Sequence, residues 1–402
     1  MKMQASYTLR TRRNENKMKS RMLISITAIT VLAAVAIPQQ FAAQDNRDDK
    51  QAKIVTFEAP QSGTGLGQGT RALGINPAGA ITGFTRDAGN VRHGFLRARD
   101  GAFTMFDAPG AGTSPGQGTR AYSINPGGAI AGWYSDASGV VHGYLRARDG
   151  SFTTFDVPGA GGAGTGPYPG TLASFINPAG AITGLYTDTN YAAHGFVRAP
   201  DGTITTFDAP GAGTGSGEGT FVETPTGGIN PAGEITGDSC DAVTCHGFLR
   251  TPDGTITSFD APGADHTPGS GNGTFGVGLT PNGEIEGVDV DVNGVLHGFV
   301  RSTAGTFTTY DAPGAGTGVG QGTLPESNNT PGAITGQFID GNFVNHAFVR
   351  SNQGIFSTFD VPGMGTSAGQ GTIPVANNNT GAIVGEAIDG GTVIHGFLAT
   401  GF

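Results

Sequence analysis

Short apolar segments separated by turn-forming residues run along most of the chain. In one stretch they cover residues 118–125, 129–134, 142–146 and 152–156, and clusters of Asn, Asp, Gly, Pro and Ser lie between them. None of these segments has the 3.6-residue spacing of an amphipathic helix. The pattern therefore predicts an all-β protein built from short antiparallel strands and tight turns.

This pattern recurs seven times with a period near 50 residues. The triplet Asp-Ala/Val-Pro begins at Asp107, Asp156, Asp208, Asp260, Asp311 and Asp360, and Glu58 opens the first copy. A histidine keeps the same spacing, at His93, His142, His194, His246, His297, His346 and His395. Four strand segments in about 50 residues match the size of a propeller blade.

The phase of the repeat favours a closed ring. The chain begins with a lone fourth-strand segment at residues 54–58 and ends with the other three segments at residues 372–399. Pairing of these pieces would complete one repeat and leave few open sheet edges. We expect a seven-bladed β-propeller of four-stranded antiparallel blades over residues 54–402, closed by the N-terminal strand completing the last blade.

Two recurring motifs, Ile-Asn-Pro-x-Gly-x-Ile-x-Gly and His-Gly/Ala-Phe, resemble the bacterial extracellular repeat family known as HAF. One copy carries the His-Ala-Phe triplet itself, at residues 346–348. The resemblance extends over residues 54–402 and implies secretion and a repeat architecture, without an established activity. The strand order also resembles that of WD-type seven-bladed propellers at the level of architecture.

The first 43 residues are predicted to be a signal peptide. An apolar run at residues 22–36 follows a basic stretch, and Ala34-Val35-Ala36 has the form of a signal-peptidase site. The run is short for a bilayer span, although an uncleaved N-terminal anchor is the alternative. Met18 is an alternative start, and residues 44–53 are an expected polar linker. We expect a secreted or periplasmic protein, with no membrane insertion after signal cleavage.

Composition and charge narrow the expected partners. Gly (71) and Pro (23) are abundant among the 402 residues, and charged residues make up only 13%. After residue 21, acidic residues outnumber basic ones by 31 to 15. Such a surface argues against nucleic acids and anionic membranes as partners. Lysine is absent after Lys53, which excludes Schiff-base chemistry in the repeats. We expect a monomer.

The seven repeated histidines are expected to be structural. Zinc needs several ligands around one ion, and equivalent positions in different blades lie far apart. Most of the histidines also follow an aspartate on the preceding turn, as Asp136 precedes His142 and Asp340 precedes His346. We predict that an Asp–His hydrogen bond holds each such turn.

Polar residues directly before the Gly-Thr of each first strand form the main candidate binding site. They are Gln68, Gln117, Glu218, Asn272, Gln321 and Gln370, with Tyr168 in the departing third copy. Amides, carboxylates and an aromatic ring suit sugar hydroxyls. Arg71 and Arg120 are further candidate binding residues, and they break the symmetry of the repeat. The alternative is that each amide only ties neighbouring loops together.

Acidic residues accumulate in the later copies, at Glu234, Glu284, Glu286 and Glu386 on or beside the strands expected near a central channel. Paired carboxylates there could perform acid–base chemistry. The alternative is a wet, acidic channel wall.

Residues 289–294, Asp-Val-Asp-Val-Asn-Gly, resemble the start of a calcium loop. Asp289, Asp291 and Asn293 would supply oxygen ligands at alternate positions, so Ca²⁺ is a candidate ion. The twelfth position is Val300 rather than Glu, and an ordinary turn rich in Asp and Asn is the alternative. No other cofactor is expected.

The only two cysteines, Cys240 and Cys245, flank one predicted turn. In an exported chain this spacing predicts a disulfide that closes the hairpin.

These features favour a binding or interaction scaffold that recognises a glycan or a partner protein at one propeller face. No nucleophile elbow and no zinc-protease motif is present in the sequence, so no catalytic residue is assigned and it stays open whether the protein is an enzyme. The alternatives are an extracellular polysaccharide hydrolase or lyase that uses acids of copies four to seven, and a structural envelope protein.

Overall fold

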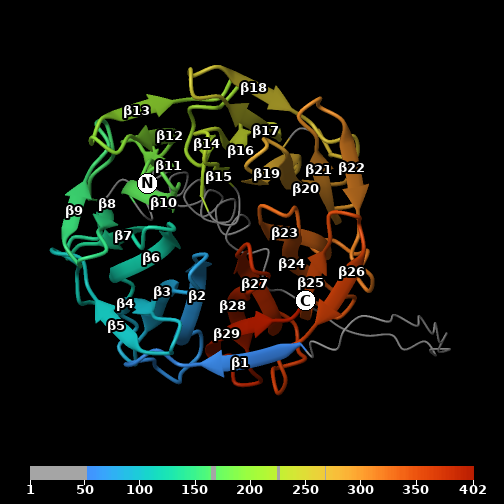
Figure 1. Cartoon of the computed structure of the whole chain (residues 1–402). Helices are drawn as coiled ribbons and strands as arrows, with labels where there is room; N and C mark the ends of the chain where they lie inside the picture. The colour runs from blue at the N-terminus through green and yellow to red at the C-terminus, as the bar shows by residue number, and fades with distance from the viewer. Residues whose placement is uncertain (1–51, 164–168, 224–226, 268) are drawn as a thin grey trace, which may run out of the picture.

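The computed structural model describes residues 52–163, 169–223, 227–267 and 269–402. The predicted signal peptide and most of the predicted linker lie outside these residues. The described residues form β-strands and no helix, so none of them belongs to a helix that could cross a membrane. The predicted all-β class is confirmed. The strands are arranged as a nearly closed ring (Figure 1).

The strands nearest the centre of the ring are called the inner strands (Figure 1). They are β2 (Gly69–Ile75), β6 (Gly118–Ile124), β10 (Gly170–Ile176), β14 (Gly219–Phe221) with β15 (Gly228–Ile229), β19 (Thr274–Leu279), β23 (Gly322–Asn328) and β27 (Gly371–Asn377). The second strands are β3 (Ile81–Arg86), β7 (Ile130–Ser135), β11 (Ile182–Thr187), β16 (Ile235–Cys240), β20 (Ile285–Val290), β24 (Ile334–Ile339) and β28 (Ile383–Ile388).

The third and outer strands follow towards the rim. The third strands are β4 (Arg92–Arg97), β8 (Val141–Arg146), β12 (Ala193–Arg198), β17 (Cys245–Arg250), β21 (Leu296–Arg301), β25 (Asn345–Arg350) and β29 (Ile394–Thr400). The outer strands are β5 (Phe103–Phe106), β9 (Phe152–Phe155), β13 (Ile204–Phe207), β18 (Ile256–Phe259), β22 (Phe307–Tyr310), β26 (Phe356–Phe359) and β1 (Lys53–Phe57).

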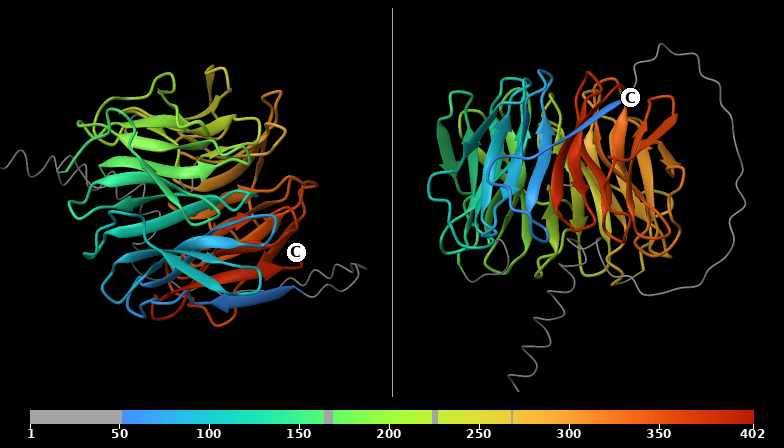
Figure 2. Two further views of the ribbon diagram at one scale, coloured as in Figure 1. Left: turned by 60° about the vertical axis from the view of Figure 1, so that its left-hand side comes forward. Right: turned by 90° about the horizontal axis from the view of Figure 1, so that it is seen from below.

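Pairing within each copy of the repeat is antiparallel and follows chain order, as in β2–β3–β4–β5. The two ends of the described chain complete one such set, because β1 pairs antiparallel with β29 from Lys53↔Thr400 to Phe57↔Gly396. Figure 2 shows β1 lying along the C-terminal strands. This pairing is the closure that the phase of the repeat predicts.

The start of each inner strand also pairs with the third strand of the preceding copy, at a glycine that is the first residue of the strand or, for β19, the residue before it. Gly69 pairs in parallel with Ile394 and has a φ of 113°. A Cβ atom there would lie 2.0 Å from the Ile394 carbonyl oxygen. Both the backbone conformation and the close approach require glycine, which explains the repeated Gly-Thr dipeptide.

Aromatic side chains of the third strands pack between neighbouring copies. Phe95, Phe196, Phe248, Phe299, Phe348, Phe397 and Tyr144 are among the largest fully buried side chains. Phe57 meets Phe95 of the next copy edge-to-face, with ring centroids 6.4 Å apart. Gly94 makes room for this layer, because a Cβ atom there would lie 2.5 Å from the Phe106 ring. The repeated His-Gly-Phe thus supplies the core between copies.

A chain of asparagine side chains links the copies near the centre. In six copies a buried asparagine donates from its amide nitrogen to a backbone carbonyl of the next copy; four of them belong to the Ile-Asn-Pro motif, and Asn329 and Asn378 stand at the same place without that motif. The donor–acceptor pairs are Asn76–Asn125, Asn125–Asn177, Asn177–Asn230, Asn230–Thr280, Asn329–Asn378 and Asn378–Asn76. Thr280 stands where the remaining asparagine would be. The Asn378–Asn76 bond, at 3.0 Å, joins the two ends of the ring.

Candidate functional site

The repeated histidines form ion pairs with the acid of the Asp-Ala/Val-Pro triplet rather than chiefly with the turn. In six copies Nδ1 lies 2.7–3.0 Å from an aspartate oxygen fourteen residues later, as in His142–Asp156. The turn aspartate expected from the sequence lies at 3.3–3.9 Å from Nε2 in six copies, as in His142–Asp136. The hydrogen bond to Asp156 raises the pKa of His142.

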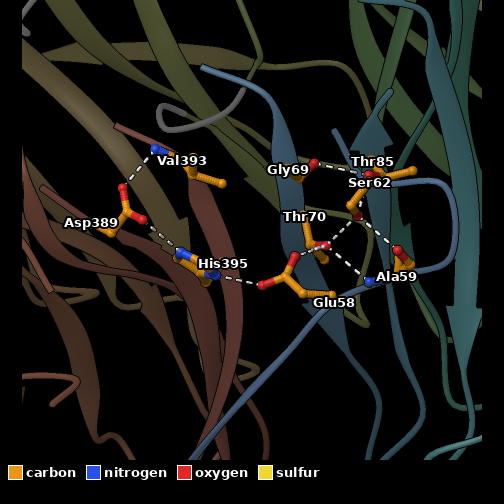
Figure 3. Close-up of polar contacts among 9 residues, drawn as sticks. All are labelled: Glu58, Ala59, Ser62, Gly69, Thr70, Thr85, Asp389, Val393 and His395. Carbon is orange, nitrogen blue, oxygen red and sulfur yellow. Dashed lines mark hydrogen bonds and ion pairs between the residues drawn. The ribbon is translucent and has the colours of Figure 1, made fainter. Parts of the chain in front are cut away.

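The same arrangement closes the ring where β1 and β2 meet the C-terminal strands, a place called the seam (Figure 3). His395 Nδ1 binds Glu58, and Thr70 donates a hydrogen bond of 2.8 Å to the other oxygen of that carboxylate. Burial lowers the pKa of His395, but the hydrogen bonds to Glu58 and Asp389 outweigh it and raise that pKa. The Thr70 hydroxyl also accepts from the Ala59 amide. The triplet therefore holds both the third and the inner strand.

The polar residues before the inner strands bind within their own loops. The side-chain oxygens of Gln68, Gln117, Glu218, Gln321 and Gln370 accept from backbone N–H groups three residues earlier, at 2.8–3.0 Å. The amides of Gln68, Gln117 and Gln370 also donate to the turn between the second and third strands. Asn272 donates to Asp265. Tyr168 lies outside the described residues.

Arg71 and Arg120 lie on neighbouring inner strands in different surroundings. Arg71 pairs with Glu386 across the seam, and their side chains are 26% and 9% exposed. The Arg120 guanidinium lies over the Trp133 ring at 4.2 Å and over Phe84 at 5.4 Å, and it donates to the Tyr122 hydroxyl. Tyr122 and Trp133 stack with centroids 5.9 Å apart.

The sequence reasoning missed Tyr122 and Trp133 as site residues. Trp133 is the single tryptophan of the chain. The sequence did carry a signal for Tyr122 and Trp133, because both stand at positions where the other copies of the repeat have unrelated residues.

The acids of the later copies fall into different environments. Glu234 accepts from Asn230 at 2.6 Å, and Glu284 is exposed on the next inner turn. Glu286 is only 1% exposed, and burial raises its pKa well above the ordinary value. Glu386 is the partner of Arg71. The structure therefore does not gather Glu234 and Glu284 with Glu286 as one set of contacts in the described residues.

Glu326 of β23 joins this group. Part of the residue stays exposed, but desolvation of its carboxyl raises its pKa well above the ordinary value, and Glu386 and Glu286 add to that effect. Gln337 donates a hydrogen bond of 3.3 Å to it. A carboxyl group whose pKa is raised is suited to donate a proton to a bound molecule.

The candidate calcium residues do not share one loop surface. Asp291 Oδ1 accepts from the Asn293 and Val295 amides at 2.8 Å, which is the turn that Asp136 and Asp340 also make. Asp289 is fully buried in β20, and burial raises its pKa to about 6. Its two oxygens have no hydrogen-bond partner among the described residues.

The predicted disulfide is present between Cys240 and Cys245. It joins the facing ends of β16 and β17, where the two residues are register partners. A disulfide is consistent with an extracellular location.

No family model and no curated protein matches this chain. Its resemblance to HAF repeats therefore rests on the motifs alone. Solved structures do match. The β-propeller domain of the Trilobed protease from Pyrococcus furiosus has a TM-score of 0.52 and 8% identity over 83% of this chain and 96% of that one. It is described as having an open velcro topology, whereas here β1 pairs with β29.

Weaker likeness extends to other solved structures. Puromycin hydrolase has a TM-score of 0.48 and 12% identity over 79% of this chain, which spans only 50% of the hydrolase. AofleA from Arthrobotrys oligospora has a TM-score of 0.38 and 12% identity over 68% of this chain and 76% of that one. The similarity to the protease domain supports a β-propeller scaffold and leaves activity undetermined.

Proposed function

We propose that this chain is an exported, seven-bladed β-propeller that binds a glycan at its inner strands. The antiparallel sets described above are taken as four-stranded blades, with β27, β28, β29 and β1 as the last. The disulfide supports export, and the predicted signal peptide would direct it.

The proposal rests on the positions at which the seven copies of the repeat differ. Towards the rim they repeat the same chemistry. An arginine at the end of the third strand lies 4.6–5.1 Å from an aromatic ring of the preceding outer strand in six copies. A histidine–acid pair accompanies it in every copy.

The inner strands repeat no such chemistry at the residue that follows the Gly-Thr pair. This position is occupied in turn by Arg71, Arg120, Leu172, Phe221, Phe275, Leu324 and Ile373. The facing residues are Phe84, Trp133, Leu185, Asp238, Val288, Gln337 and Glu386. A purely structural ring has no need of this variety, whereas a binding site for an asymmetric ligand does.

The chemistry at these positions suits a carbohydrate. Arg71 and Glu386 present a donor and an acceptor for hydroxyl groups, and partly exposed Tyr122 offers an aromatic face. Gln337 and Glu326 add further polar groups on β23 and β24. Arg71 is cationic, whereas Glu386 and Glu326 are acidic. A site that carries both charges favours a sugar with several hydroxyl groups over a simple anion.

A panel of neutral and uronic-acid oligosaccharides tests the proposal by the melting temperature of the purified full chain. A bound ligand must raise it. Arg71→Gln should abolish the shift, and Arg148→Gln, an exposed arginine on the β8–β9 turn, should leave it unchanged. No shift with any sugar would refute glycan binding and leave a protein partner or a structural role, whereas equal shifts in all three proteins would refute a sugar site at Arg71.

The raised pKa of Glu326 favours one alternative, a polysaccharide hydrolase or lyase with Glu326 as general acid. Mass analysis of the sugar after incubation separates the two functions. Shortened products from the wild type, and none from Glu326→Gln, would establish the enzyme and contradict simple binding.

A further inference from the structure

The fourth histidine–acid pair departs from the other six. His246 Nδ1 lies 2.7 Å from Asp260, as elsewhere, but the described residues give no ion pair between His246 and the turn residue Asp241. The turn between β16 and β17 has four residues where the turn between β3 and β4 has five. Asp241 instead accepts from the Val243 and Thr244 amides. One side of the His246 ring is therefore released from its usual partner.

A second imidazole lies over the face of the His246 ring. His266 is the eighth histidine of the chain and stands outside the repeat. Its ring stacks on that of His246, with centroids 5.7 Å apart and an interplanar angle of 15°. One ligand atom from each of His246, Asp260 and His266 lies within 4.8 Å of the others.

The loop before β19 holds His266 in this place. Asp265 is 7% exposed, and its amide donates to the Val290 carbonyl at 2.8 Å. Its carboxylate accepts from the Thr267 hydroxyl and amide and from the Asn272 side chain. These hydrogen bonds, the one from the Thr267 hydroxyl first, lower the pKa of Asp265 to about 2. The loop beside the second imidazole is thus held by its own hydrogen bonds, and the Thr244 hydroxyl oxygen lies 3.4 Å from His266 Nδ1.

We propose that His246, Asp260 and His266 bind one divalent transition-metal ion of the Zn²⁺ class. Two imidazole nitrogens and one carboxylate oxygen form a donor set that Zn²⁺, Ni²⁺ and Cu²⁺ accept, whereas Ca²⁺ takes six to eight oxygens. Zn–N bonds are about 2.0–2.1 Å long, so the three side chains must close around the ion. All three reach the surface, which leaves them room to move. Three protein ligands leave one position for water.

This site is independent of the proposed sugar site, because its residues belong to the third strand and to the loop between β18 and β19. An ion there would tie that loop to β17 and so link two neighbouring copies. Cys240 and Cys245 lie nearby, but their disulfide removes them as ligands.

Isothermal titration of the metal-free, non-reduced full chain with ZnCl₂ tests the proposal. We expect one ion per chain, and at least a tenfold loss of affinity in His266→Ala. His297→Ala is the matched control, since it removes the equivalent repeated histidine of the next copy, where the partners are Asp311 and Asp291. Unchanged far-UV circular dichroism would show that each variant folds.

Cu²⁺ electron paramagnetic resonance supplies a second measurement. The wild type should show nitrogen couplings from two imidazoles, and His266→Ala from at most one. Failure of the wild type to bind Zn²⁺, equal affinity in wild type and His266→Ala, or an equal loss in His297→Ala would overturn the proposal.

Discussion

Removal of the Asn378 amide should weaken the whole ring through its seam. Asn378 donates to the Asn76 carbonyl at 3.0 Å, and its oxygen accepts from the Thr380 amide and hydroxyl and from the Ala382 amide. Asn378→Ala would leave the Ala382 amide buried without this partner, whereas the Asn76 carbonyl would lose the bond from Asn378 and keep the one from the Gly79 amide, at 2.9 Å. An unsatisfied buried group costs about 1–3 kcal/mol and a lost hydrogen bond about 0.5–1.5 kcal/mol, so we expect a loss of about 3 kcal/mol in the free energy of unfolding.

Urea unfolding measures this loss, with the fluorescence of Trp133 as the probe. Trp133 is the only tryptophan, is 3% exposed, and lies in β7 far along the chain from residue 378. A shift of the Trp133 transition therefore reports that the seam and the second copy unfold together.

Two variants make the reasoning testable. Asn342→Ala is the control, because Asn342 bonds only with Asp340 on an exposed turn, and it should change stability by less than about 0.5 kcal/mol. Asn378→Asp keeps the acceptor for the Ala382 amide and loses the donor to Asn76, so it should lose about 0.5–1.5 kcal/mol, the part that belongs to the bond with Asn76. Stability of Asn378→Ala within about 0.5 kcal/mol of the wild type would refute the role of the seam.

Three further predictions concern other departures from the repeat. Thr280→Asn should supply the missing link to the next copy and stabilise the protein by about 0.5–1.5 kcal/mol in urea, and a loss of stability would contradict it. The raised pKa of Asp289 means that the unfolded state loses its proton first, so stability should fall by about 3 kcal/mol as the pH rises from about 4 through about 6. Asp289→Asn should remove that fall when the melting temperature is measured as a function of pH. The same pH profile in the variant and the wild type would refute the assignment of the fall to Asp289. Reduction of Cys240–Cys245 should expose two titratable thiols and cost about 2 kcal/mol, whereas two reactive thiols before reduction would exclude the disulfide.

The ring could be predicted because repeated residues carry it. Gly69, Gly94 and Phe95 have counterparts in most copies, and their spacing specifies which strands face each other. The pairing of β1 with β29 followed from the phase of the same repeat. The disulfide followed from two cysteines on one turn.

The candidate site could not be predicted to the same extent, because it depends on contacts between copies. The sequence placed Asp136 next to His142 but gave no sign that Asp156, on the returning outer strand, lies closer. It also grouped Gln68 with the other polar residues before the first strands as one candidate binding site, whereas the Gln68 side chain accepts a hydrogen bond within its own loop. Tyr122 packing on Trp133 depends on the register of β6 and β7, which no motif specifies.

Hydrogen–deuterium exchange on the full chain, with and without the oligosaccharide that most raises the melting temperature, tests the central proposal most directly. We predict slower exchange in peptides from the inner strands β2, β6 and β23 and from β28, with no change in the outer strands β5, β9 and β13. Protection confined to the outer strands, or no change in exchange with any sugar, would contradict glycan binding at the inner strands.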